Sequence, residues 1–368
     1  MSENPVAHVD LGAIAHNLGC VKERLAPGVQ AMAMVKADGY GHGIVPVARR
    51  LAAAGATWFG AATPGEARAL RAAGLDQGVL LLSPVTDAAV ITELCELNVA
   101  LVATDAASVD AYLAADLPRP LRLHLKVDTG MGRLGLPWGR SAEVATKIAG
   151  ERRLELEGVW THFTDADTPS RDATLAQLEA FELALAALAR HGVEVPLRHT
   201  ANSAATLAYP EAHYDMVRPG IVLYGHYPSE AVAAVEPRLR PAMRLSAPVT
   251  FVKPVGAGTG VSYGRLWRAP ADTRLATVRI GYADGYPRLL TGVGWASVRG
   301  VRCEVVGRVC MDQLLLDVGA ATDVRVGDRA TLWGGDGPDA EALAQAIGTV
   351  SYELLTRLMP RVEREYSG

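Results

Sequence analysis

The residue whose surroundings point most directly to chemistry is Lys36. It directly follows the apolar run AMAMV (31–35) and begins the segment KADGYGHG, in which three glycines follow within seven residues. A lysine after a strand is usually a solvated surface residue. Glycines beside an apolar strand instead indicate a backbone shaped around a ligand. A lysine held in such a place can lose its proton and form a Schiff base with an aldehyde.

Other polar side chains also stand at or just after the ends of apolar runs. They are Asp128 and Arg133 in KVDTGMGRLG, His162 in THF, Asn202 and Ser203 in HTANSAA, and Arg218 in VRPG. In a β/α barrel, chemistry is carried out at the carboxyl ends of the strands and in the loops after them. These side chains therefore converge on one mouth if the strands close into a barrel.

Two of these segments have a structural and a functional interpretation. GMGRLG (130–135) matches the dinucleotide fingerprint, but Pro137 follows early, so we interpret it as a turn presenting Arg133. Asn202 and Ser203 before SAATLAY are typical of a helix N-cap. The same helix start could bind phosphate, with a further N–H from Gly220. His162 is equally compatible with a packed core histidine.

Tyr263 lies in the glycine-rich segment GAGTGVSYG, which fits either a hairpin tip or a ligand site. The segment Cys310-Met311-Asp312, taken by itself, fits an ordinary strand and turn. Aromatic residues make up only 6% of the chain, so tyrosines grouped with glycines favour the ligand site.

The elements that must position these residues are short apolar strands alternating with alanine-rich helices. The expected strands are AMAMV (31–35), TWFGAA (57–62), GVLLLS (78–83), VALVAT (99–104), LRLHLKVD (121–128), LELEGVWTHF (154–163), LRHTAN (197–202) and MVRPGIVLYG (216–225). Strands that are apolar on both faces predict a covered parallel sheet. Eight such strands favour a closed β/α barrel, and an open doubly wound sheet is the alternative. Thr63-Pro64-Gly65-Glu66 predicts a capping box at one helix start.

After Glu236 the pattern changes to apolar runs separated by Gly/Asp turns such as VGAGTG and GGDGPD. This pattern predicts an antiparallel β domain. We therefore expect an α/β fold with two domains, a (β/α)8 barrel over residues 1–236 and a mostly β domain over 237–368.

Composition narrows the class of protein. With 49% hydrophobic and 21% charged residues over 368 positions, the chain is typical of folded globular proteins. A formal net charge of −4 offers no basic field for nucleic acid or anionic membranes. The longest uncharged run, 51–65, is too short to span a bilayer. The four cysteines form no CxxC pair, which favours reduced thiols over a disulfide framework or zinc site, and we expect a cytoplasmic protein.

The motifs together resemble the alanine racemase family. VKADGYGHG is similar to its pyridoxal-phosphate lysine signature, and KVDTGMGRLG, THF, HTANSAA, VRPGIVLYG, GVSYG, GYADGYPR, GRVCMDQ and VSYELLTRL resemble its other motifs in the same order. The resemblance spans nearly the whole chain. It implies a TIM-like barrel followed by a β domain, and a homodimer in which the β domain of one subunit completes the active site of the other.

The resemblance also implies roles for individual residues. Lys36 would hold pyridoxal phosphate through a Schiff base and act as the base for D-alanine, and Tyr263 from the partner subunit would act as the base for L-alanine. The cofactor-binding residues would be Tyr40, His162, Asn202, Ser203, Arg218, Gly220, Ile221 and Tyr352, with Arg218 beside the pyridine nitrogen. Arg133 and the Met311 backbone would bind the substrate carboxylate. No metal is implied.

Three points stay open at this level. Lys126 matches a lysine that is often carbamylated in the family, and a simple pairing with Asp128 is the alternative. Thr164 and Asp165 stand where smaller or less charged residues are expected. The competing functions are a broad-specificity or serine/lysine racemase, a decarboxylase, and a non-catalytic pyridoxal-phosphate carrier, which would lack the β domain.

Overall fold

The computed structural model describes residues 3–236 and 238–368, so Pro237, the first residue of the expected second domain, lies outside it. The chain divides into two compact units. One contains residues 13–39 and 44–240. The other contains the N-terminal residues through Gly12, residues 40–43 and residues 241–368. The division after Arg240 lies close to the expected one, whereas the N-terminal residues and 40–43 group with the second unit.

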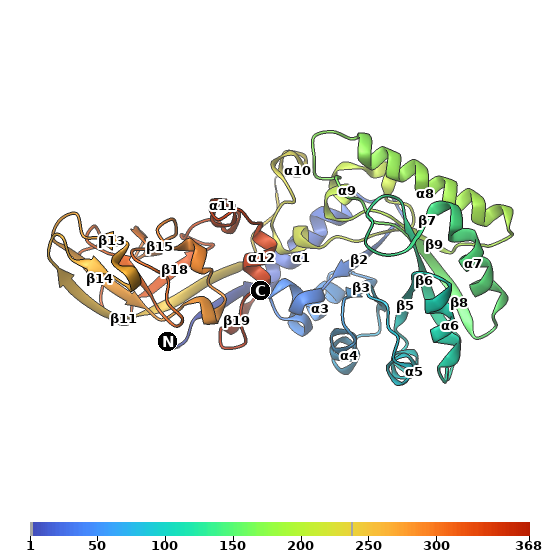
Figure 1. The fold of residues 1–368 in the computed structure, drawn as a ribbon, viewed down its shortest axis with the longest axis horizontal. Helices are drawn as coiled ribbons and strands as arrows, with labels where there is room; N and C mark the ends of the chain where they lie inside the picture. The colour runs from blue at the N-terminus through green and yellow to red at the C-terminus, as the bar shows by residue number, and fades with distance from the viewer. Residues whose placement is uncertain (1–2, 237) are drawn as a thin grey trace. The chain divides into compact units, whose positions relative to one another are not determined.

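The first unit is a parallel barrel (Figure 1). Its strands are β2 (Gln30–Met34), β3 (Trp58–Ala61), β4 (Gly78–Leu81), β5 (Ala100–Ala103), β6 (Leu121–Asp128), β8 (Leu154–Trp160), β9 (Leu197–His199) and β10 (Met216–Val217). From β2 to β9 each strand pairs in parallel with the next one named, and β10 pairs in parallel with β2. Backbone hydrogen bonds from Asp215 N to Arg198 O (3.1 Å) and from Arg218 N to Ala201 O (2.9 Å) join the last two strands. The barrel is therefore nearly closed, which excludes the open sheet.

Each expected strand overlaps a strand of the barrel, because a run of apolar residues is what a strand buried on both faces requires. All residues of β3 and β5 are buried, for example. The eighth strand is much shorter than expected. It ends at Val217 and is followed by the 3-10 helix η3 (Ile221–Tyr224), since Pro219 cannot donate to a ladder and Gly220 has φ −118° and ψ −98°.

Helices surround these strands (Figure 1). They are α3 (Ile44–Ala53), α4 (Pro64–Ala72), α5 (Ala88–Glu96), α6 (Ala106–Ala114), α7 (Ser141–Gly150), α8 (Asp172–Arg190), α9 (Ser203–Ala208) and α10 (Glu230–Val235), with α1 (Leu11–Lys22) at the start of the chain. The capping box of α4 is confirmed, because Thr63 Oγ1 accepts from Glu66 N at 3.3 Å and Glu66 Oε2 accepts from Thr63 N at 3.1 Å.

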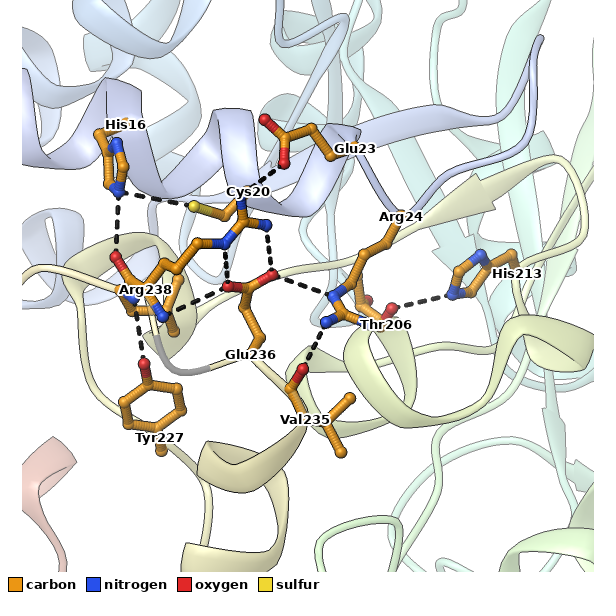
Figure 2. Close-up of polar contacts among 11 residues, drawn as sticks. His16, Cys20, Glu23, Arg24, Thr206, His213, Tyr227, Val235, Glu236 and Arg238 are labelled. Atoms are coloured by element: carbon orange, nitrogen blue, oxygen red, sulfur yellow. Dashed lines mark hydrogen bonds and ion pairs between the residues drawn. The ribbon is translucent and has the colours of Figure 1, made fainter.

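Glu236, directly after α10, connects the end of the barrel unit to α1 and the residues that follow α1 (Figure 2). This carboxylate is fully buried and accepts from Arg24 Nε at 3.1 Å and from Arg238 Nε at 2.8 Å. Arg238 also donates to Glu23 at 2.8 Å, and its carbonyl lies 3.0 Å from His16 Nε2. The two arginines lower the pKa of Glu236 to about 2, chiefly through the Arg238 hydrogen bond.

The second unit is mostly β, as expected. Its main sheet contains β16 (Val301–Glu304), β15 (Trp295–Val298), β18 (Arg329–Trp333), β11 (Met243–Val255), β1 (Val6–Asp10) and β19 (Glu363–Ser367) in that order, and β14 (Thr273–Val278) joins β11 to β17 (Leu314–Asp317). A small ribbon pairs β12 (Gly260–Val261) with β13 (Trp267–Arg268), and α11 (Ala340–Ala346) and α12 (Ser351–Thr356) follow.

The N-terminal strand β1 was not expected from the sequence. It runs antiparallel to β11 and parallel to β19, which explains why the N-terminal residues group with the second unit. Cys20, Cys95, Cys303 and Cys310 are free thiols. Among the helices of the described residues, none is both long and apolar enough to cross a lipid bilayer.

Candidate active site

Lys36 begins α2 (Lys36–Tyr40), a turn whose backbone is left-handed. The φ angles of Ala37, Asp38 and Tyr40 are 53°, 53° and 52°, values that cost energy in residues other than glycine. Side-chain carboxylates stabilise both ends of the turn. Ala37 N donates to Glu66 Oε1 at 2.7 Å, and Ile44 N donates to Asp38 Oδ1 at 2.9 Å. The position of Lys36 is therefore fixed by its backbone surroundings.

The pKa of Lys36 is lowered, first by burial and then by the charges of Arg133 and Arg218, while Glu66 opposes the shift. A lowered pKa increases the fraction of the neutral amine near neutral pH. The neutral amine is the form that attacks an aldehyde or accepts a proton.

Arg218 follows β10 and is buried inside the barrel, with 3% of its surface exposed. It donates to the backbone carbonyls of Thr161 (2.6 Å), His199 (2.8 Å) and Thr200 (2.9 Å). Burial lowers the pKa of Arg218 to about 9, which still leaves the guanidinium charged at neutral pH. The site thus contains a fixed buried cation at the end of this strand.

A chain of hydrogen bonds leads from Arg218 through the barrel. Arg218 Nη1 lies 3.0 Å from His199 Nδ1, His199 Nε2 lies 2.7 Å from His124 Nδ1, and His124 Nε2 lies 3.2 Å from Glu157 Oε2. An arginine only donates and a carboxylate only accepts, so each neutral imidazole must accept through Nδ1 and donate through Nε2. Burial lowers the pKa of both histidines, which keeps them neutral.

His162 follows β8, and its Nδ1 lies 3.4 Å from Arg218 Nη2. Its pKa is well below the ordinary value because of burial first, and then because of Arg218, Arg133, Lys126 and Lys36. Two arginines and the charged fractions of two lysines therefore act on one neutral imidazole. This region of the barrel carries a concentration of positive charge suited to an anion.

Asn202 and Ser203 start α9, as expected from the N-cap interpretation. Asn202 Oδ1 accepts from Ala205 N at 3.0 Å, and Gly220 N donates to Ser203 Oγ at 2.8 Å. Ile221 is fully buried and begins η3. The loops after β9 and β10 thus meet at Ser203 and Gly220.

The turn GMGRLG is followed by the short strand β7 (Leu136–Pro137) rather than by a helix, in agreement with its interpretation as a structural turn. Asp128 holds it by accepting from Gly130 N at 3.0 Å and Gly132 N at 3.0 Å. Arg133 is exposed and lines an open pocket of about 280 Å³ beside Asp128.

Lys126 lies in β6 and is 2% exposed. Its Nζ donates to Val127 O at 2.7 Å and lies 5.2 Å from the centre of the Trp160 ring. Burial lowers the pKa of Lys126 to about 7, although the charge of Asp128 opposes the shift. Much of this amine is therefore neutral at physiological pH.

Gln177 of α8 connects two loops of this mouth, a role that sequence analysis missed. Its Oε1 accepts from Thr164 N (2.9 Å) and Thr164 Oγ1 (3.0 Å), and its Nε2 donates to Thr129 Oγ1 (3.2 Å) and His162 O (3.1 Å). The amide thereby uses its full hydrogen-bonding capacity. Its only sequence signal is a polar residue within an otherwise apolar helix face.

The remaining expected residues lie in the second unit. The rings of Tyr40 and Tyr352 approach with centroids 6.2 Å apart at 51°. Burial raises the pKa of Tyr40. Tyr263 and Met311 are 70% and 53% exposed. Ser262, next to Tyr263, donates to Arg308 O at 2.8 Å, and Ala283 N donates to Met311 O at 3.0 Å. The loops that carry Tyr263 and Met311 are thus joined through residues 308–311.

Comparisons with known proteins cover the whole chain and identify one family. Family models described as "Alanine racemase, N-terminal domain" and "Alanine racemase, C-terminal domain" match residues 9–228 and 242–366. A protein of Desulforamulus reducens named "Alanine racemase" is 43% identical over 371 residues, covering 100% of both chains.

Solved structures give the same result. The alanine racemase of D-cycloserine-producing Streptomyces lavendulae superposes with a TM-score of 0.94 at 39% identity, covering 100% of this chain and 98% of its own. The alanine racemase of Bacillus anthracis, with bound L-Ala-P, superposes with a TM-score of 0.94 at 36% identity, covering 100% of this chain and 96% of its own.

Proposed function

The chain belongs to the alanine racemase family and is an isomerase of alanine, and we propose that it works by two-base proton transfer with pyridoxal phosphate held at Lys36. In this proposal Lys36 serves the D-face and Tyr263 of the partner subunit serves the L-face. The observation that carries it is the amine of Lys36, which has a lowered pKa and is fixed in a left-handed turn next to buried cationic groups.

The described residues fit this cofactor. An aldehyde requires a nucleophilic amine, which Lys36 offers, and a phosphate requires cations and N–H donors. The charges of Arg133 and Arg218, together with the charged fractions of Lys126 and Lys36, act at His162, and this positive charge favours an anionic group. When bound, pyridoxal phosphate would supply the electron sink that makes the α-proton of alanine acidic.

The protein's own contribution is to remove a proton from one face of the α-carbon and to deliver another proton to the opposite face. Lys36 Nζ would accept or return the proton on one face, and the partner's Tyr263 would do so through its phenol oxygen on the other. A free tyrosine has a pKa of about 10, so its surroundings in the assembled site must favour transfer. Racemisation follows because one base removes the proton from one face while the other base delivers its own proton to the opposite face.

Arg218 would lie beside the pyridine nitrogen. Its guanidinium stays charged and can only donate hydrogen bonds, so it cannot accept a proton from that ring. Burial keeps His199 and His124 neutral, and the directional chain through them fixes the orientation of the guanidinium. Arg218 would thereby limit the electron-withdrawing power of the ring and suppress side reactions such as transamination.

The remaining binding roles are part of the proposal. Arg133 and the Met311 backbone would contact the substrate carboxylate, and His162 would lie against the cofactor ring. The phosphate would be bound by Tyr40, Ser203, Tyr352 and the backbone at Gly220 and Ile221, with Asn202 nearby. The neutral fraction of Lys126 also supports its carbamylation, since the neutral amine is the form that reacts with carbon dioxide. The product D-alanine would supply peptidoglycan synthesis in the cytoplasm.

The test is proton NMR of the protein with pyridoxal phosphate and L-alanine in heavy water, followed by chiral analysis. We expect the α-proton signal to disappear while D-alanine accumulates. Tyr263→Phe should reduce the rate by at least about a hundredfold and leave cofactor binding intact. Retention of the α-proton in the wild type, or full activity of Tyr263→Phe, would contradict the proposal. L-serine and L-lysine as substrates test the width of the specificity.

A further inference from the structure

We propose that Glu66 is a positioning residue for Lys36, a role that rests on the function proposed for that lysine. One carboxylate on α4 accepts hydrogen bonds from two segments of the chain. Glu66 Oε1 accepts from Ala37 N at 2.7 Å. Glu66 Oε2 accepts from Ala62 N at 2.7 Å and from Thr63 N at 3.1 Å.

Helix capping accounts for only one of these oxygens. A capping box requires the glutamate to accept from the N-cap backbone, which is the bond from Thr63 N to Oε2. The other oxygen, Oε1, takes no part in the capping box. It accepts from Ala37 N, in the peptide group that directly follows the Cα of Lys36. Because a peptide group is rigid and planar, fixing its N–H also fixes the position of the Lys36 Cα, the atom from which the side chain leaves the backbone.

The turn after Lys36 needs such support. Ala37 and Asp38 are non-glycine residues with φ of 53°, a conformation that costs energy and persists only where the surroundings enforce it. Asp38 Oδ1 holds the far end of the turn through Ile44 N. Glu66 holds the near end, beside the lysine. Without it, the turn would keep the bond from Gly39 N to Val35 O (2.8 Å) but would lose the hydrogen bond closest to Lys36.

Glu66 also acts on Lys36 by charge. Its carboxylate raises the pKa of the lysine against the lowering by burial, Arg133 and Arg218. Glu66 therefore both holds the backbone next to Lys36 and raises the pKa of its amine.

Thr63 provides a matched control on the same helix. Its hydroxyl accepts from Glu66 N and completes the capping box, but its capping bond does not involve the turn at Ala37. Thr63→Ala removes a cap and should lower the stability of the protein. Glu66→Gln keeps the length of the side chain but leaves one acceptor oxygen, so an NH2 group must face one of the two sets of N–H donors. The two variants separate helix capping from support of Lys36.

The first readout is hydrogen–deuterium exchange at Ala37 in the full-length protein. Ala37 is exposed in the chain, so slow exchange of its amide depends on the bond to Glu66. We expect protection in the wild type and in Thr63→Ala, and its loss in Glu66→Gln. Rapid exchange of this amide in the wild type would overturn the proposal even if Glu66→Gln does not fold.

The second readout is covalent capture of pyridoxal phosphate, measured by borohydride trapping and mass spectrometry of the Lys36 peptide. We expect capture in Glu66→Gln to be slowed about ten- to a hundredfold, and capture in Thr63→Ala to stay near the wild-type rate. Equal rates in all three proteins would refute the role of Glu66. Failure of the wild type to be labelled at Lys36 would instead refute the proposed function.

Discussion

Gln177 shows at the residue scale how a side chain remote from the reacting atoms can control them. Its amide bonds Thr164 and the His162 carbonyl on one loop, and Thr129 at the start of the turn that presents Arg133 on another. The side chain is 5% exposed, so water cannot readily replace these partners. Losing the amide would leave buried donors and acceptors unpaired and free the two loops to move separately.

We therefore expect Gln177→Met, which nearly conserves volume, to lower the free energy of unfolding by about 2–4 kcal/mol. The KM for alanine should rise as well, because Arg133 is proposed to contact the substrate carboxylate. Urea denaturation and steady-state kinetics measure the two effects. Gln345→Met on α11 is the control, since that exposed side chain makes a single bond to Glu341 at 3.5 Å. Equal behaviour of the two variants would show that Gln177 has no special role.

The residue types in the sequence indicated the candidate reactive side chains but not the side chains that position them. Lys36 and Arg218 stand out because charged residues at strand ends are unusual next to apolar runs. Glu66 was recognised only as a helix cap, since its second bond is to a residue 29 positions away. The alternating direction of His199 and His124 likewise depends on side chains brought together by the closed barrel. Such partners follow from tertiary contacts, which no local pattern contains.

At the element scale, periodicity predicted the barrel well because buried parallel strands need uninterrupted apolar runs. The same rule failed for residues 216–225, where apolar composition continues past Pro219 into η3. It also missed β1, because this strand is defined by pairing with β11 and β19 rather than by a distinctive pattern of its own. Elements defined by long-range pairing are those that sequence patterns identify least reliably.

Glu236 also connects two elements. Its hydrogen bonds with Arg24 and Arg238 join the segment after α10 to the chain beyond α1 (Figure 2). Its lowered pKa corresponds to about 3 kcal/mol of folding free energy at neutral pH. Because the folded-state pKa lies below that of the unfolded chain, this stabilisation is present above about pH 4.5 and is lost as the pH falls toward 2.

We expect Glu236→Gln to lose about 3 kcal/mol of stability at pH 7, and less at pH 4, because protonation then weakens the wild type too. Urea denaturation at the two pH values measures this. Glu93→Gln is the control. Its ion pair with Arg68, at 2.7 Å, is exposed on both sides and should contribute less than about 1 kcal/mol. A Glu236→Gln difference that does not depend on pH would show that the charge of Glu236 is not what stabilises the segment.

At the scale of the whole molecule, the second unit has large apolar side chains that are exposed in the single chain. Tyr263, Leu266 and Met311 are 70%, 62% and 53% exposed, and their loops are joined through residues 308–311. Exposed groups of large apolar side chains are characteristic of interfaces. This surface supports the proposed homodimer, in which Tyr263 acts in the site of the neighbouring subunit.

Mixing two inactive variants tests that arrangement directly. A homodimer of Lys36→Ala or of Tyr263→Phe has one base missing from every site. In a mixed dimer with shared sites, one site lacks both bases and the other retains both. Equal co-expression should therefore restore about a quarter of the wild-type activity, since half of the randomly formed dimers are mixed and each has one working site. If both bases came from the same subunit, every site of the mixed dimer would lack one base and the mixture would stay inactive.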